Sequence, residues 1–158
     1  YSDPKNKELA DVFKAPFTLN APFRPKSIRY TAAKKGKNIL VYEGGESSRF
    51  DEFAIREGLK GTLRVLKYLG MSEAYHSNNE FENRVMFKSS WIRAKNSGLL
   101  QILVKSGAKV SKNQILGHIT DPFGDFKVQI KSPRDAYIIG LNNNPLLHQG
   151  DAIAHLAY

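Results

Sequence analysis

Glu43 is the residue of this sequence best suited to acid–base chemistry. It follows a largely apolar run, residues 38–42, and precedes Gly44 and Gly45. Such a run is typical of a strand buried on both faces of an α/β sheet, and catalytic groups gather at the carboxyl ends of such strands. A carboxylate at that edge suits a general base, since it is partly desolvated and has room for a water molecule. A glutamate that simply ends a strand gives the same pattern, so the residues alone leave both interpretations open.

The other residue types that serve catalysis give no such pattern. The sequence has no cysteine, which excludes disulfides, cysteine nucleophiles and cysteine-based zinc sites. None of its four histidines belongs to a His-x-x-Glu or His-Glu-x-x-His motif. His118 and His155 precede the last aliphatic residue of two similar segments, which favours a packing or surface role, while His76 falls in a polar connector and His148 beside a turn. We therefore expect no metal ligand in this chain.

A helix is expected after Glu43. Ser48 and Asp51 form a Ser-x-x-Asp capping pattern, and Gly70 suits the end of the helix. Gly58 and Gly61 inside it each cost about 1 kcal/mol relative to alanine. Their presence predicts close backbone packing, although tolerated surface glycines look the same. The helix has these large apolar residues on one side: Ile55, Leu59, Leu63, Leu66 and Leu69.

Two shorter helices are expected before the strand. Residues 4–14 form the first, with Asp3 as its cap and Pro4 in its first turn. Residues 15–26 contain three prolines and are expected to be a loop. A second helix over residues 27–35 ends at a glycine.

The chain changes character after residue 82. Residues 71–82 are polar and aperiodic, which indicates a connector. From residue 84 onward, short strand-like runs alternate with turns, a pattern that predicts an all-β sandwich or barrel. The expected strands are 85–87, 90–94, 99–103, 115–120, 126–131, 136–141 and 152–157.

This β part resembles the barrel-sandwich fold of biotinyl and lipoyl carrier domains, because residues 107–119 and 149–156 are similar segments with residues 131–139 between them. A carrier needs a modifiable lysine at the tip of a hairpin. The corresponding tip, residues 120–125, has no lysine, and Lys127 already falls in the following strand. The resemblance therefore predicts the fold and not the carrier chemistry.

A set of motifs resembles the succinylglutamate desuccinylase/aspartoacylase family. In that family an apolar strand ends in Glu-x-Gly or Glu-Gly-Gly, a helix ending in Leu-Gly follows, and a β domain contains Arg-Ala-x-x-Ser-Gly-Leu. Each motif is degenerate, but their order and spacing agree from Ser27 onward. The matching segments are 39–45, 58–71, 93–99, 107–124 and the Gly-Asp-Ala of 150–152.

The resemblance implies a zinc carboxypeptidase-like catalytic domain followed by a β domain. In such enzymes zinc is held by two histidines and a glutamate, and that motif is expected upstream, outside this chain. The family's strand-end glutamate, matched by Glu43, takes a proton from the attacking water and then protonates the leaving amine. Arg49 is a candidate to bind a substrate carboxylate, although an arginine in such a loop is more often a surface side chain.

The composition limits the partners. The net charge is +9, but the basic residues of the second half are spread singly, so we expect no nucleic-acid surface. No apolar run approaches the roughly 18 residues that span a bilayer, so we expect no membrane segment. The absence of a secretory signal and of cysteine fits a cytoplasmic protein. A start at Tyr1 without an initiator Met indicates that an upstream part was removed or is not in this chain.

These patterns predict an α+β chain: residues 1–70 as the C-terminal portion of an α/β catalytic domain, residues 71–82 as a connector, and residues 83–158 as a β barrel-sandwich-like domain. The expected function is a zinc-dependent deacylase acting on N-acyl amino acids or related amides or esters, with Glu43 as general base. The chain alone is expected to be inactive. The alternative is a non-catalytic module whose β part mediates binding or homo-oligomer contacts.

Overall fold

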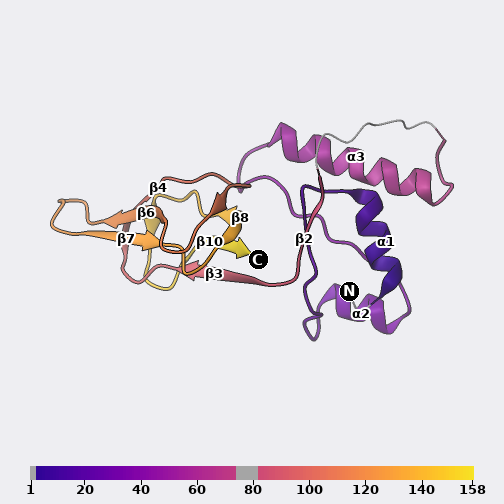
Figure 1. Ribbon diagram of the computed structural model, residues 1–158, viewed down its shortest axis with the longest axis horizontal. Helices are drawn as coiled ribbons and strands as arrows, with labels where there is room; N and C mark the ends of the chain where they lie inside the picture. The colour runs from indigo at the N-terminus through magenta and orange to yellow at the C-terminus, as the bar shows by residue number, and fades with distance from the viewer. Residues whose placement is uncertain (1–2, 74–81) are drawn as a thin grey trace. The chain divides into compact units, whose positions relative to one another are not determined.

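The chain forms two compact units, Tyr1–Val85 and Met86–Tyr158. The computed structural model describes residues 3–73 and 82–158. No helix within those residues is both long and apolar enough to cross a membrane. The elements in and next to the first unit (Figure 1) are α1 (Pro4–Phe13), β1 (Phe17–Leu19), α2 (Ile28–Lys34), α3 (Glu52–Tyr68) and β2 (Arg84–Met86).

The two short helices begin at the caps that the sequence predicts or implies. The Asp3 carboxylate accepts a hydrogen bond from the backbone N–H of Lys5 (2.8 Å), and Pro4 is the first residue of α1. The hydroxyl of Ser27 accepts from the backbone N–H of Tyr30 (3.2 Å) at the start of α2. Both predicted helices are therefore confirmed.

Helix α3 begins at Asp51 and not at Ser48. The Asp51 carboxylate accepts from the backbone N–H of Ala54 (3.0 Å), which makes Asp51 itself the cap. Ser48 has a φ of 63°, whereas a capping residue is normally extended. The predicted capping pattern therefore misassigned the start of the helix, although the helix itself is confirmed.

The buried side of α3 carries alanine, glycine and one glutamate, and no large apolar residue. Ala54, Glu57 and Gly61 are buried, whereas Ile55 and Leu59 on the large apolar side are 50% and 59% exposed. A Cβ at Gly61 would lie 2.5 Å from the ring of Phe13 on α1. The close backbone packing predicted for this glycine is confirmed.

Residues 38–42 form no strand, so the prediction of a buried strand at this position is wrong for the described part of the chain. Val41 and Tyr42 are 53% and 41% exposed. The backbone N–H of Ile39 donates to the side chain of Asn6 on α1 (3.0 Å) and not to a neighbouring strand. A strand buried on both faces needs hydrogen-bonded neighbours on both sides, and the described residues supply none. We call residues 38–45 the strap.

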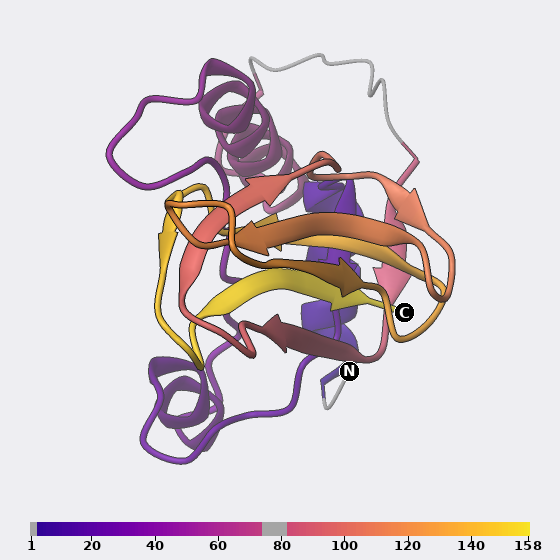
Figure 2. The ribbon, with the colours of Figure 1, turned by 90° about the vertical axis from the view of Figure 1, so that its left-hand side faces the viewer.

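The second unit consists of two four-stranded antiparallel sheets. The strand orders are β3-β10-β8-β5 and β7-β6-β4-β9. Figure 2 shows the last strand, β10 in yellow, running beside its neighbours. The strands are β3 (Ser89–Arg93), β4 (Gly98–Ile102), β5 (Lys109–Val110), β6 (Ile115–Thr120), β7 (Lys127–Lys131), β8 (Ala136–Leu141), β9 (Leu146–Leu147) and β10 (Ala152–Ala157).

One hydrophobic core joins the two sheets. Leu116 of β6, Ile138 of β8 and Leu156 of β10 are fully buried in it. The sheets close into no barrel within the described residues, so of the two predicted forms the sandwich is the one observed. The seven predicted strands are present, whereas β1, β5 and β9 were not predicted because each has only two or three residues.

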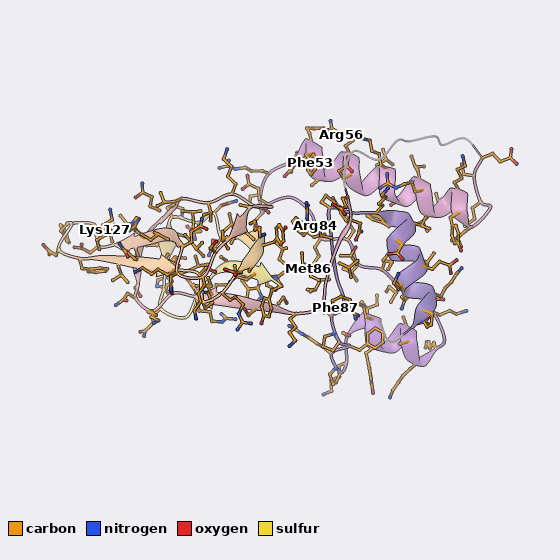
Figure 3. All side chains as sticks on the ribbon, in the orientation of Figure 1. Phe53, Arg56, Arg84, Met86, Phe87 and Lys127 are labelled. Carbon is orange, nitrogen blue, oxygen red and sulfur yellow. The ribbon has the colours of Figure 1, made fainter. Side chains whose placement is uncertain are left out.

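The hairpin of β6 and β7 has no lysine at its tip. Lys127 is the first residue of β7 (Figure 3), as the sequence indicates. The Asp121 carboxylate instead organises the tip by accepting hydrogen bonds from the backbone N–H groups of Phe126 (3.1 Å) and Phe123 (3.2 Å). These hydrogen bonds lower the pKa of Asp121, and the bond from Phe126 has the largest effect. The tip therefore lacks the attachment residue that a carrier requires.

Candidate active site around Glu43

Glu43 lies in the strap with its side chain exposed. Tyr42 contacts α3, and a Cβ at Gly44 would lie 2.7 Å from the Tyr42 hydroxyl oxygen. Tyr42 and Gly44, the residues on either side of Glu43, therefore lie against each other.

Tyr42 anchors the strap to the helices. Its hydroxyl donates a hydrogen bond to the backbone carbonyl of Ala54 on α3 (2.7 Å). Its ring lies against the ring of Phe13 on α1, with 5.4 Å between the centroids. A hydrogen bond of this kind contributes about 1 kcal/mol net, and the aromatic contact adds a comparable amount.

Two glycines make room for the Tyr42 ring. A Cβ at Gly58 on α3 would lie 2.7 Å from Cε1 of the ring, and a Cβ at Gly44 would meet the phenol oxygen. Gly45 has a φ of 84°, which side chains rarely tolerate. The Gly-Gly pair after Glu43 thus has a structural reason, since the first glycine admits the phenol and the second turns the chain.

Burial raises the pKa of the Tyr42 phenol, and the carboxylates of Glu57 and then Asp51 raise it further. Glu57 is only 4% exposed, and its Oε1 lies 3.4 Å from the Lys60 ammonium. The phenol therefore stays protonated and able to donate its hydrogen bond to Ala54 throughout the neutral pH range.

Arg49 lies in the loop between the strap and α3. Its guanidinium Nε is 3.5 Å from a carboxylate oxygen of Glu46, and its side chain is 77% exposed. Arg49 lines a hollow of about 160 Å³ together with Tyr42, Gly44, Gly45 and the first turn of α3, whereas Glu43 is not part of the lining. Ligand pockets usually have about 300–1,000 Å³, so this hollow has room for only part of a small molecule.

The described residues do not form a zinc site. Within residues 3–73 and 82–158, no three His, Asp or Glu side chains stand together as metal ligands do. His118 lies in β6, His155 stacks on Trp91 (4.2 Å between ring centroids), and the backbone of His148 donates to the carboxylate of Asp151 (2.8 Å). His76 lies outside the described residues. A resident zinc ion therefore has no ligand set in this part of the chain.

The catalytic role of Glu43 stays a prediction, and sequence reasoning did not single out Tyr42, the residue that ties the strap to α3. Tyr42 reads as the last apolar residue of a strand, and nothing in its type indicates a hydrogen bond to α3. The available signal was the glycine at position 58, which predicted a close neighbour without identifying it as Tyr42.

Comparison of the fold with known proteins gives a consistent result. No protein-family model matches the sequence, and no curated protein matches it in sequence. A succinylglutamate desuccinylase/aspartoacylase from Rhodobacter sphaeroides superposes with a TM-score of 0.85 at 21% identity, covering 100% of this chain and 52% of its own. The product-bound ectoine utilization protein EutE (DoeB) from Ruegeria pomeroyi gives 0.84 at 18%, covering 96% and 48%. An aspartoacylase family protein from Mesorhizobium loti gives 0.75 at 14%, covering 97% and 46%.

The chain thus spans about half the length of the solved structures that it matches. The fold of the chain is α+β, and it is the fold found in that half of these deacylase-family proteins. The resemblance that the sequence motifs indicate is confirmed at the level of the fold.

Proposed function

We propose that this chain is part of a succinylglutamate desuccinylase/aspartoacylase family enzyme, a hydrolase that removes the acyl group from N-acyl amino acids or related amides. The observation that supports this most directly is the structural match over nearly the whole chain. The TM-score is 0.85 for a protein named for that family and 0.84 for the ectoine utilization protein EutE (DoeB). The order of the sequence motifs supports the same family independently of the fold.

The middle of the strap, which is exposed, fits a chain that is part of a longer protein. Leu40 and Val41 are exposed, and neither shares a backbone hydrogen bond with another described residue. Apolar side chains and open peptide groups together are the features of a strand whose neighbours come from elsewhere. Residues of the longer protein, outside this chain, pair with the strap and bury it, and Glu43 then stands at the end of a completed strand.

Glu43 is the general base of the reaction. Its carboxylate accepts a proton from the water that attacks the acyl carbonyl, and it returns a proton to the leaving amine. The exposed position of Glu43 on the strap leaves its carboxylate open to water and substrate. Its neighbour Tyr42 is fixed by a hydrogen bond to the backbone carbonyl of Ala54, and this defines the backbone from which Glu43 projects.

The zinc ion expected for such an enzyme is held by residues outside this chain. Three protein ligands and an open position are the usual arrangement in catalytic zinc sites, and the described residues contain no such set. Glu43 therefore supplies the base, and the described residues supply no set of metal ligands.

Arg49 is the candidate for binding a substrate carboxylate. Its side chain is exposed beside the hollow next to the strap, and within the described residues its one ion pair is with Glu46, at 3.5 Å. A substrate carboxylate can form a bidentate pair with the guanidinium of Arg49, which is stronger than the single contact with Glu46. Glu46 is then displaced when the substrate binds.

The test uses the longer protein with N-acetyl-L-aspartate and N-succinyl-L-glutamate as probes. Glu43→Gln is expected to lower kcat by about 100-fold or more, as loss of a general base does. Glu52→Gln, which removes an exposed carboxylate in the first turn of α3, away from the lining of the hollow, is the matched control and is expected to retain the rate. Equal rates for the two variants would show that Glu43 is not the base and would favour the alternative, a module for binding or assembly.

A further inference from the structure

We propose that Tyr42 is a positioning residue that holds the carboxylate of Glu43 in place for proton transfer. The inference rests on the proposed role of Glu43, and it adds a residue that the sequence motifs do not assign. Tyr42 directly precedes Glu43, so contacts that fix the position of Tyr42 also restrict the peptide group that joins it to Glu43.

The side chain of Tyr42 is held at three points. Its hydroxyl donates to the carbonyl of Ala54 at 2.7 Å, its ring packs against Phe13 at 5.4 Å, and Gly58 lies under the ring edge. The Ala54 carbonyl lies in the first turn of α3, where it also faces the next turn of the helix; a carbonyl oxygen has two lone pairs and accepts both bonds. Tyr42 is thus tied to the most regular element of its unit.

The chain on the other side of Glu43 offers no comparable anchor. Gly44 and Gly45 follow, and glycine is the residue with the greatest backbone freedom. Within the described residues, neither the backbone nor the side chain of Glu43 makes a hydrogen bond. Tyr42 is therefore the nearest fixed point, and its release allows Glu43 to move with the flexible pair.

The fit of Tyr42 depends on the absence of two side chains. A Cβ at Gly58 would approach Cε1 of the ring to 2.7 Å, and a Cβ at Gly44 would approach the hydroxyl to 2.7 Å. Gly58→Ala therefore displaces the ring while the hydroxyl is still present. This variant tests the position of Tyr42 separately from its hydrogen bond.

The first experiment measures the order of the backbone in this chain by ¹⁵N relaxation. In the wild type the Glu43 amide is expected to have an order parameter near the roughly 0.85 of rigid backbone, and in Tyr42→Phe to fall towards about 0.6. Tyr68→Phe is the matched control, since it also removes a phenol hydroxyl, here one on α3 whose oxygen lies 3.4 Å from the Lys5 ammonium. An unchanged order parameter in Tyr42→Phe would overturn the proposal.

The second experiment measures kcat and KM in the longer protein with the same two probes. Tyr42→Phe and Gly58→Ala are expected to lower kcat by about 10- to 100-fold with KM unchanged, because misplacement by about 1 Å has effects of that size. Tyr68→Phe is expected to leave both constants unchanged. Rates are taken well below each variant's melting temperature, so that loss of folded protein does not contribute.

The two proposals fail in different ways. If Glu43→Gln loses its rate while Tyr42→Phe and Gly58→Ala keep theirs, or change only KM, the positioning role is wrong and the general base remains. If Glu43→Gln keeps its rate, the proposed function itself is wrong.

Discussion

The ring of Phe13 lies so close to the backbone of Gly61 that a Cβ there would come within 2.5 Å of two ring carbons. Helices α1 and α3 therefore approach each other at a glycine. The predicted consequence is that Gly61→Ala destabilises the first unit by about 1–3 kcal/mol through overpacking, although alanine is the better helix former. Urea denaturation checks this, with the exposed Thr62→Ala as the control.

The contact between Arg64 and Phe13 gives a second prediction. The Arg64 guanidinium donates from Nε (3.1 Å) and Nη2 (2.5 Å) to the carbonyl of Phe13, the last residue of α1. A charged group that satisfies a terminal helix carbonyl contributes about 1.5–3 kcal/mol. Arg64→Met is expected to lower the free energy of unfolding by that amount, measured with urea.

Arg56 provides the comparison. It lies on the exposed side of the first turns of α3 (Figure 3), and no ion pair of it is found within the described residues. Arg56→Met is expected to change stability by less than about 0.5 kcal/mol. An equal loss in both variants would mean that the charge of α3, and not the contact with Phe13, is what stabilises the unit.

The phenol of Tyr42 predicts a dependence on alkaline pH. Burial first, then Glu57 and Asp51, raise its pKa above 10.0 in the folded chain. The folded state therefore favours the protonated phenol, and this contribution to stability is complete below pH 10 and is lost as pH rises through the folded pKa. Unfolding measured from pH 9 upward is expected to show a steeper loss in the wild type than in Tyr42→Phe, and parallel curves would contradict the shift.

Gly98 gives a prediction for the second unit. A Cβ there would run into the carbonyl oxygen of Thr120 on β6 and lie 2.8 Å from Cγ2 of Ile119. Gly98→Ala is expected to cost about 1–3 kcal/mol, since β4 and β6 must move apart. The control is Asn96→Ala in the preceding turn, where the side chain is exposed; thermal unfolding of the two variants measures the difference.

The elements with strong local signals were the ones that the sequence predicted well. The cap at Asp3 and the turns of the β part determine local backbone geometry, so α1, α2 and the seven main strands are found where they were expected. The two-residue strands β5 and β9 carry too short a pattern to be recognised. Ser48 was misassigned because its left-handed backbone depends on the loop around it and not on its own preference.

The strap failed as a strand prediction for a different reason. Its residues have the apolar pattern of a central strand, but a strand forms only where neighbouring strands supply hydrogen bonds. In the described residues the Ile39 N–H donates a hydrogen bond to the side chain of Asn6, and the Tyr42 hydroxyl donates one to the backbone carbonyl of Ala54. Contacts between segments far apart in sequence decided this outcome, and for the same reason the anchoring role of Tyr42 could not be predicted.

Helix α3 has its large side chains on the outside. Ile55 and Leu59 lie one turn apart and are both at least half exposed, while the inner side carries Ala54, Glu57 and Gly61. Water in contact with such a face is unfavourable, by roughly 25 cal/mol for each Å² of apolar surface. The 158-residue chain is therefore expected to self-associate in solution through this face. Charged substitutions at these two positions are the first change to make when the chain is prepared for spectroscopy.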